Sequence, residues 1–425
     1  MGTDASQSRR LHRYFVDRTV RKRLISCLGH RYAFPRVMDC DASHEVSCSV
    51  CLLWSCKALT SEPLNPMKLF TCQSCGQHVY FENVRCTRCG HTLGFLPDRM
   101  EISALEDKGD GSWRALAAPE DANRYRACAN STQHEVCNWM VPEQDPDPLC
   151  PSCRLNSTIP DLSVAGNQVL WQRLETQKRR LVYSLIRLGL PVQARKLDPA
   201  GLSFDFLADP DPAFNETGRV LTGHADGLIT LNIAEADPAT RERMRQDMAE
   251  PYRTILGHFR HESGHYYWDR LVRNSEWLQE FRRLFGDETL DYGQALERHH
   301  AGGPPPDWQE HFVSAYASSH PWEDWAETWA HYLHIVDTLE TAQSFGVGVR
   351  PETGGTDPMA KDPGFDPYTQ PDFAPILEHW LPLAFALNSL NRSIGHEDAY
   401  PFVLAPPAVE KLQLVHRIIH SPPNA

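Results

Sequence analysis

The spacing of apolar residues predicts that the C-terminal part of the chain is mainly helical. In residues 161–192, "DLSVAGNQVLWQRLETQKRRLVYSLIRLGLPV", Leu, Ile and Val recur at steps of three and four residues, which predicts one long amphipathic helix. Gly189 and Pro191 are typical residues at which such a helix ends. Similar spacing predicts further helices over 251–273, 275–285, 307–318, 321–345, 373–392 and 407–420.

A few segments alternate instead between apolar and polar residues. "LSFDFLA" at 202–208 predicts a strand, and residues 219–237 predict two strands that turn at Asp226-Gly227, a pair that favours a tight hairpin. The expected fold class is therefore α+β: a small β-rich ribbon followed by a mainly helical domain that contains a small sheet.

Cysteines before the helical region occur in pairs. "CQSC" and "CTRC" place Cys72, Cys75, Cys86 and Cys89 at the two-residue spacing that lets both thiolates of a pair reach one zinc ion. A glycine follows each pair and allows the backbone N–H groups to turn toward sulfur. This pattern predicts a zinc ribbon with a structural zinc ion.

A second group is less regular. It consists of Cys128, Cys137, Cys150 and Cys153, of which only the last two have the two-residue spacing. We expect a second structural zinc ion here, with His134 as an alternative ligand and buried free thiols as the alternative to a metal site. A third group, Cys40, Cys48, Cys51 and Cys56, has no glycine turns and is not expected to bind metal.

Composition limits the partners and the compartment. The net charge is −13, although residues 1–66 hold 10 Lys/Arg against 6 Asp/Glu, so a basic extension precedes an acidic body. The acidity argues against nucleic acid as a partner. We see neither a signal peptide nor an apolar run long enough for a membrane span, and therefore expect a cytoplasmic protein with reduced thiols. The expected domains are a disordered extension (1–66), a zinc ribbon (67–96), a second zinc-binding segment (97–160) and a mainly helical domain (161–425).

The predicted helix over 251–273 contains His261-Glu262-Ser-Gly-His265, an H-E-x-x-H motif. Two histidines four residues apart project from one helix face and can bind one zinc ion, while Glu262 can reach a water molecule beside it. The motif follows the predicted strand pair, and zinc peptidases commonly place an edge strand beside the motif helix, where an extended substrate can pair with it.

A third ligand is expected from the helix predicted over 321–345. One of its faces carries Glu323, Glu327, His331 and His334 at helical spacing. We expect Glu327 to be the third ligand and His331 to orient the ligands by hydrogen bonding, with Glu323 as the second choice for the ligand. Asp357 is a further alternative.

These motifs together resemble a bacterial family of zinc-binding metallopeptidases that carry an N-terminal zinc ribbon. The resemblance runs from about residue 67 to residue 420 and rests on "MKLFTCQSCG", "LCPSCRLNSTIPDL", "LITLNIAEADPATRERMR", "GHFRHESGHYYWD" and "HPWEDWAETWAHYLHIVDT". It implies a ribbon followed by a gluzincin-like peptidase domain. His261 and His265 match its ligand positions, Glu262 its catalytic glutamate and Glu327 its third ligand.

The expected activity is zinc-dependent hydrolysis of peptide or protein substrates, with one catalytic and one or two structural zinc ions. Two alternatives are an inactive scaffold that binds a protein partner through its ribbon, and a hydrolase of non-peptide amides. The segment 347–372, rich in Pro and Gly, is expected to be a lid or a connector. Candidate donors to the oxyanion of the transition state are His300, Tyr316, Tyr332 and His334.

Overall fold

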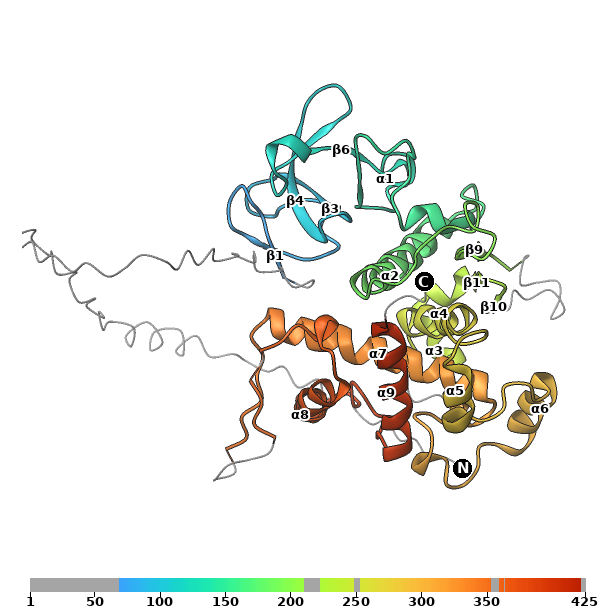
Figure 1. Ribbon diagram of the computed structural model, residues 1–425. Helices are drawn as coiled ribbons and strands as arrows, with labels where there is room; N and C mark the ends of the chain where they lie inside the picture. The colour runs from blue at the N-terminus through green and yellow to red at the C-terminus, as the bar shows by residue number, and fades with distance from the viewer. Residues whose placement is uncertain (1–68, 210–221, 248–252, 353–358, 363, 422–425) are drawn as a thin grey trace, which may run out of the picture. The chain divides into compact units, whose positions relative to one another are not determined.

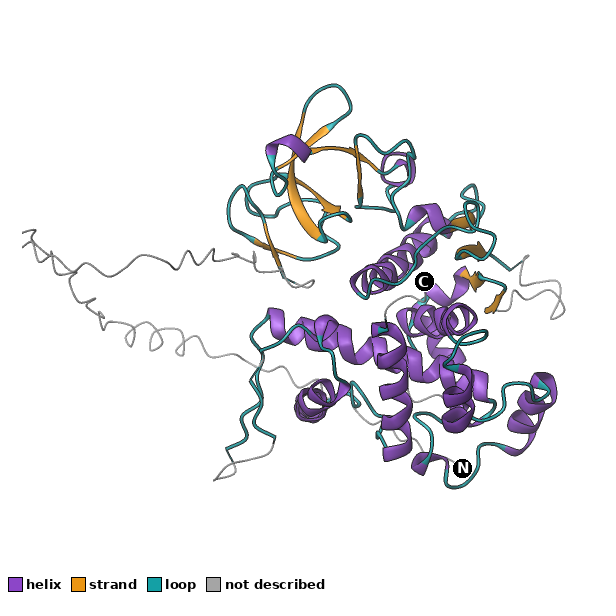
Figure 2. Ribbon diagram, viewed as in Figure 1, coloured by secondary structure: helices purple, strands orange, loops and turns teal. Residues whose placement is uncertain are grey.

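A computed structural model describes residues 69–209, 222–247, 253–352, 359–362 and 364–421 of the 425-residue chain. The predicted extension, the third cysteine group, the first two residues of the helix predicted over 251–273, and Asp357 lie outside the described residues. A strand-rich N-terminal region is followed by a helical C-terminal region, so the predicted α+β class is confirmed (Figures 1 and 2).

The ribbon begins with a short hairpin of β1 (Phe70–Thr71) and β2 (His78–Val79). A five-stranded antiparallel meander follows, in the order β3 (Thr92–Leu96), β4 (Glu101–Asp107), β5 (Trp113–Ala115), β6 (Arg124–Ala127) and β7 (Met140–Pro142). The domain boundary expected after residue 96 falls in the turn between β3 and β4, which pair in this sheet. The two cysteine-rich segments therefore share one sheet.

The ribbon and the first long helix have a common core. Helix α2 (Asn167–Arg187) lies within the predicted helical stretch and ends before Gly189, whose φ of 68° suits a helix terminus. The buried Tyr183 of α2 packs against Phe81 and Phe95 of the ribbon, with ring centroids 5.8 and 6.0 Å apart. Such shared burial of aromatic rings joins the two regions into one folded unit.

The second sheet belongs to the helical region. Its order is β10 (Gly223–Ala225), β11 (Leu228–Asn232), β9 (Ser203–Leu207) and β8 (Asn156–Thr158), so β10 is an edge strand of the described sheet. The predicted strand at 202–208 and the predicted hairpin are confirmed. Asp226 and Gly227 both have positive φ, 48° and 84°, as a tight turn between antiparallel strands requires.

Helices make up most of the remainder. They are α1 (Ala129–His134), α3 (Pro238–Asp247), α4 (Ile255–Leu271), α5 (Leu278–Phe285), α6 (Tyr292–Gly302), α7 (Pro321–Ser344), α8 (Phe373–Ser393) and α9 (Pro406–His420). Helix α4 begins at Ile255 because the hydroxyl of Thr254 accepts a hydrogen bond from the N–H of Gly257 and caps it. Among the described helices, none combines the length and the apolar character needed to cross a bilayer.

The prediction of a helix over 307–318 is wrong. Only two short 3-10 turns form there, at Trp308–Glu310 and Tyr316–Ser318. The hydroxyl of Ser314 accepts a hydrogen bond from the N–H of Ala317 and donates another to Glu327. Side-chain bonds of this kind compete with the backbone bonds of a helix.

Candidate metal centres and catalytic site

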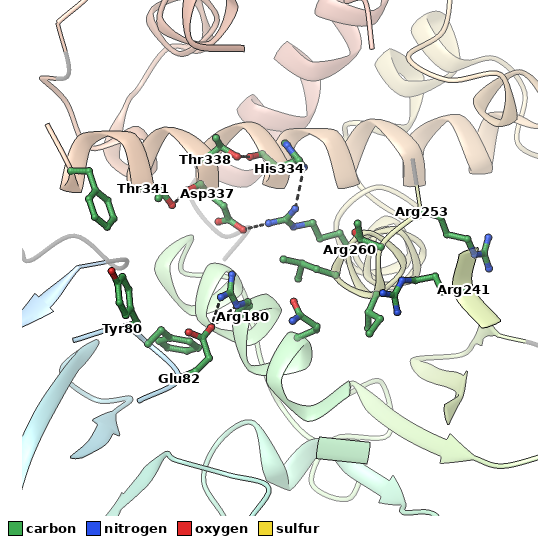
Figure 3. Close-up of a pocket in the computed structure, with 16 residues that line it drawn as sticks. Tyr80, Glu82, Arg180, Arg241, Arg253, Arg260, His334, Asp337, Thr338 and Thr341 are labelled. Carbon is green, nitrogen blue, oxygen red and sulfur yellow. Dashed lines mark hydrogen bonds and ion pairs between the residues drawn. The ribbon is translucent and has the colours of Figure 1, made fainter. Parts of the chain in front are cut away.

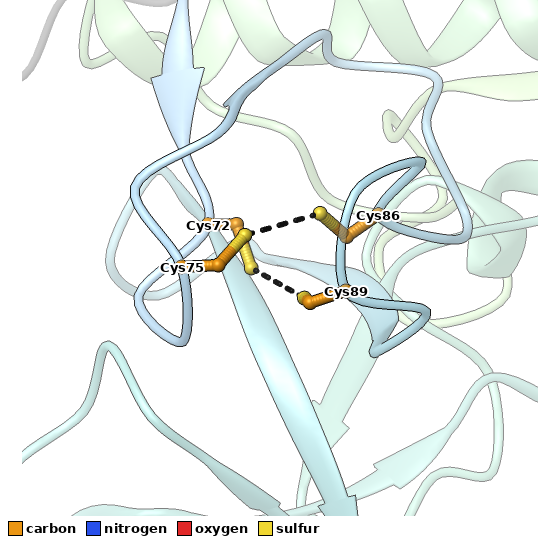
Figure 4. A group of neighbouring side chains, drawn as sticks. All are labelled: Cys72, Cys75, Cys86 and Cys89. Carbon is orange, nitrogen blue, oxygen red and sulfur yellow. Dashed lines mark hydrogen bonds between the residues drawn. The ribbon is translucent and has the colours of Figure 1, made fainter.

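The structure brings together the four cysteines of the first predicted zinc site (Figure 4). The sulfur of Cys72 lies 3.6 Å from that of Cys89, and the sulfur of Cys75 lies 3.6 Å from that of Cys86. The backbone N–H of His91 lowers the pKa of the Cys89 thiol to about 6, which favours the thiolate that zinc requires. The chemistry and spacing of the group therefore fit one zinc ion.

The second group also converges, and its four cysteines are all buried. Backbone N–H groups of Trp139, Cys150 and Cys153 each lie 3.4 Å from a sulfur of the group. His134, the alternative ligand, lies outside the group, and its ring packs against Trp171 at 5.6 Å. The arrangement fits four thiolates around one metal ion better than a mixed set.

The H-E-x-x-H motif forms the third group. His261 and His265 project from the same face of α4, with ring centroids 5.0 Å apart. Glu323, near the start of α7, faces both: its two carboxylate oxygens lie 3.0 Å from Nε2 of His261 and 3.5 Å from Nε2 of His265. One donor atom from each of these three residues lies within 4.8 Å of the others.

The structure places Glu327 differently from the expectation. Its Oε1 lies 2.6 Å from Nδ1 of His261, and its Oε2 accepts a hydrogen bond of 2.7 Å from Ser314. Glu327 therefore contacts the side of His261 that faces away from Glu323. The step of four residues from Glu323 to Glu327 advances the helix by about 6 Å, so only one of the two glutamates can lie level with both histidines.

His331 does not take the expected position beside the ligands. Its Nδ1 lies 2.7 Å from the hydroxyl of Tyr400, and its ring packs against Phe402 at 4.4 Å. It lies one further turn along α7, beyond Glu327. Glu327, and not His331, therefore contacts the ring nitrogen Nδ1 of His261.

The electrostatics of the group favour a cation. Burial opposes a positive charge on His261, but Glu323 and Glu327 outweigh it and hold the pKa of His261 well above its usual value. Two largely buried carboxylates at this place therefore require positive charge, whether a proton or a metal ion supplies it. Two imidazole nitrogens and one carboxylate are also a ligand set that zinc prefers, so the residues present fit this metal.

Two tyrosines lie beside the three donors. The hydroxyl of Tyr292 donates a 2.7 Å hydrogen bond to Glu323, and the ring of Tyr316 lies 6.0 Å from that of His261. Burial and the charges of the nearby glutamates, Glu262 included, raise the pKa values of both hydroxyls, so both are protonated donors.

Of the four candidate oxyanion donors, only Tyr316 is placed at the site. Tyr332 is fully buried and bonds His416 at 3.0 Å, while His334 lies 3.5 Å from Arg260. His300 is exposed near the end of α6. Tyr292 was missed, although Asp291 before it is a typical helix-capping residue that could have indicated the start of α6.

The edge strand β10 packs against the motif helix, as expected for a zinc peptidase. Its residue His224 lies over His265, with ring centroids 6.2 Å apart, and Trp322 covers His265 at 3.9 Å. Burial and the neighbouring His265 lower the pKa of His224 to about 3, so this ring is neutral. Neither His224 nor Trp322 was predicted from the sequence to lie at the site.

Gly264 lets the two ligand-bearing helices approach each other. A Cβ atom there would lie 2.9 Å from the Cα atom of Ala326 in α7 and 3.2 Å from Cβ of Trp329. The carbonyl of Gly264 accepts a 2.9 Å hydrogen bond from the indole of Trp325. The glycine of the motif is thus a packing residue that positions Glu323 opposite the histidines.

We expect Gly264→Ala to destabilise the protein by roughly 1–3 kcal/mol, because the added methyl group meets backbone atoms that cannot rotate away. Urea unfolding and zinc analysis would show lower stability and a weaker third site. Gly302→Ala is the matched control: its Cβ would meet nothing within 4 Å, so the substitution should be neutral or slightly stabilising. Equal stability of the two variants would contradict the packing role.

Comparisons with known proteins match two parts of the chain to two different families. A family model described as "Putative zinc-binding metallo-peptidase" matches residues 167–418, and a zinc-ribbon domain matches residues 69–164. Relatives include the uncharacterized proteins Mb2598c of Mycobacterium bovis and Rv2568c of Mycobacterium tuberculosis. Each is 43% identical over 355 residues, which is 83% of this chain and 95% of the relative. No solved structure matches.

Proposed function

The chain belongs to this family of zinc-binding metallo-peptidases, and on that premise we propose that it hydrolyses peptide bonds with a zinc ion held by His261, His265 and Glu323. The observation that supports the proposal most directly is the convergence of these three donors, with Glu262 directly after His261 in the motif helix. The proposal replaces Glu327 by Glu323 as the third ligand, because Glu323 reaches Nε2 of both histidines.

Glu262 is the proposed general base. Zinc, when bound, lowers the pKa of a water molecule and polarises the substrate carbonyl. Glu262 follows His261 directly, so its carboxylate lies beside the ligand face of α4 without being a ligand itself. It accepts the proton of the attacking water and later passes it to the leaving amine.

Other side chains orient the ligands and the substrate. Glu327 accepts the Nδ1 proton of His261 and so directs Nε2 toward the metal position. Tyr316 is the proposed donor to the developing oxyanion, because its hydroxyl is protonated and its ring lies 6.0 Å from that of His261. An extended peptide would add to the edge strand β10 and thereby pass the motif helix.

The two cysteine groups are proposed to hold structural zinc ions, which makes three zinc ions per chain. The ribbon is also the proposed contact for a protein partner or substrate. A chain that bound zinc and a protein partner but cleaved no peptide would be an inactive scaffold, the alternative that the sequence also allows.

Elemental analysis of the wild type and of the His261→Ala/His265→Ala variant tests the proposal, together with cleavage assays on an unstructured protein and on a peptide library. We expect three zinc ions in the wild type, two in the variant, and cleavage by the wild type alone. Equal zinc content in both proteins would exclude the third site. Zinc loss without any peptide cleavage by the wild type would exclude a peptidase and leave the scaffold or another amide substrate.

A further inference from the structure

A second candidate site lies on another face of the motif helix. Residues adjacent in a helix point about 100° apart, so Arg260 belongs to a different face of α4 from the proposed metal ligand His261 that follows it. On this side of α4 the structure contains a cavity of about 730 Å³ (Figure 3). This volume is in the range of cavities that bind small organic ligands.

The cavity is lined by both regions of the protein. Its walls come from the ribbon, from α2 and α3, from the first two turns of α4 and from the C-terminal half of α7. Apolar side chains such as Phe81, Leu256 and Phe345 form part of the lining. Such a surface suits the organic body of a ligand.

The charged residues of the lining are mostly positive, although the chain as a whole is acidic. The lining contains four arginines and two carboxylates: Arg180, Arg241, Arg253, Arg260, Glu82 and Asp337. Arg180 pairs with Glu82 at 2.7 Å, and Arg260 pairs with Asp337. Arg253 lies 3.6 Å from Glu235, which does not line the cavity.

Two of these arginines have unused hydrogen-bonding capacity. Arg241 bonds only the carbonyl of Glu235, and it has no carboxylate partner within the described part of the chain. Arg260 is only 6% exposed, and its Nε is buried with no hydrogen-bond partner among the described residues. A buried donor of this kind is costly unless something accepts from it.

The start of α4 also favours an anionic ligand in this cavity. Thr254, Ile255 and Leu256 line the cavity beside Arg253, so the N-terminus of this 17-residue helix is part of its wall. The N-terminus of a helix is an established binding place for phosphate, because its N–H groups and dipole favour negative charge. Guanidinium groups bind the same oxyanion through paired hydrogen bonds.

We propose that this cavity binds a phosphorylated small molecule of nucleotide size, with its phosphate at Arg241, Arg253 and the start of α4. The organic body lies against the apolar side chains of the lining. The ligand would contact the ribbon and both helices that bear the candidate metal ligands, and so would stabilise their relative positions.

Calorimetric titration of the zinc-loaded full chain with ATP, AMP and inorganic phosphate tests the proposal. We expect a nucleotide to bind the wild type, at least tenfold more weakly to Arg241→Gln, and with unchanged affinity to Arg243→Gln. Arg243 is the matched control because it is exposed on the same helix and does not line the cavity.

Three results would overturn the proposal. The first is no nucleotide binding at about 1 mM, or an equal loss in both variants. The second is binding of inorganic phosphate as tight as that of ATP and AMP, because the organic body would then make no contact. The third is binding of a glutamate-rich peptide in place of any nucleotide. Each readout is independent of peptidase activity.

Discussion

Glu323→Ala is expected to lose one of the three zinc ions per chain and all measurable peptide hydrolysis. The carboxylate of Glu323 lies 3.0 Å from His261 and 3.5 Å from His265, so its removal leaves two imidazoles, too few to hold zinc firmly. The substitution also removes the acceptor of the Tyr292 hydroxyl. Elemental analysis and a cleavage assay on the same preparation measure both effects.

Glu327→Ala is the comparison that makes this experiment decisive. Glu327 contacts the other nitrogen of His261, so its loss should weaken zinc binding by roughly 10–100-fold without abolishing it. At saturating zinc, Glu327→Ala should therefore still contain three ions. The reverse result, zinc retained in Glu323→Ala and lost in Glu327→Ala, would establish the assignment made from the sequence and contradict the geometric one.

The two glutamates show what sequence periodicity can and cannot determine. The stripe on α7 predicted that carboxylates and histidines share one face of a helix, and the two glutamates of the stripe both contact His261. It could not tell which turn of that face lies opposite His261, because the answer depends on where α4 crosses α7. The close approach at Gly264 sets that crossing, and it arises from tertiary packing.

Short sequence patterns also predicted other elements correctly only where tertiary contacts do not decide the structure. The Asp226-Gly227 turn and the cysteine pairs were predicted because their geometry depends on a few adjacent residues. The helix over 307–318 was predicted wrongly. The hydroxyl of Ser314 bonds Ala317 and Glu327, and the spacing of apolar residues contains no information about such contacts. Tyr292 and His224 reach the site from segments far apart in the chain, so no short motif contains them.

Glu262→Gln is expected to lower the rate of peptide hydrolysis by a factor of roughly 10²–10⁴ while all three zinc ions remain bound. Glutamine keeps the size of the side chain but cannot accept the proton of the attacking water. Glu262 is half-buried and is not one of the three converging donors, so neither the fold nor the metal should depend on its charge. A cleavage assay, zinc analysis and thermal unfolding of the same samples separate these effects.

The control for this substitution is Glu310→Gln, which removes the charge of an exposed glutamate in a 3-10 turn. It should retain full activity. If Glu262→Gln cleaved peptides at the wild-type rate, another group would have to be the base. If its zinc content fell to two, Glu262 would contribute to metal binding. Loss of cleavage with three zinc ions present would leave proton transfer as the function of Glu262, because binding and folding would both be intact.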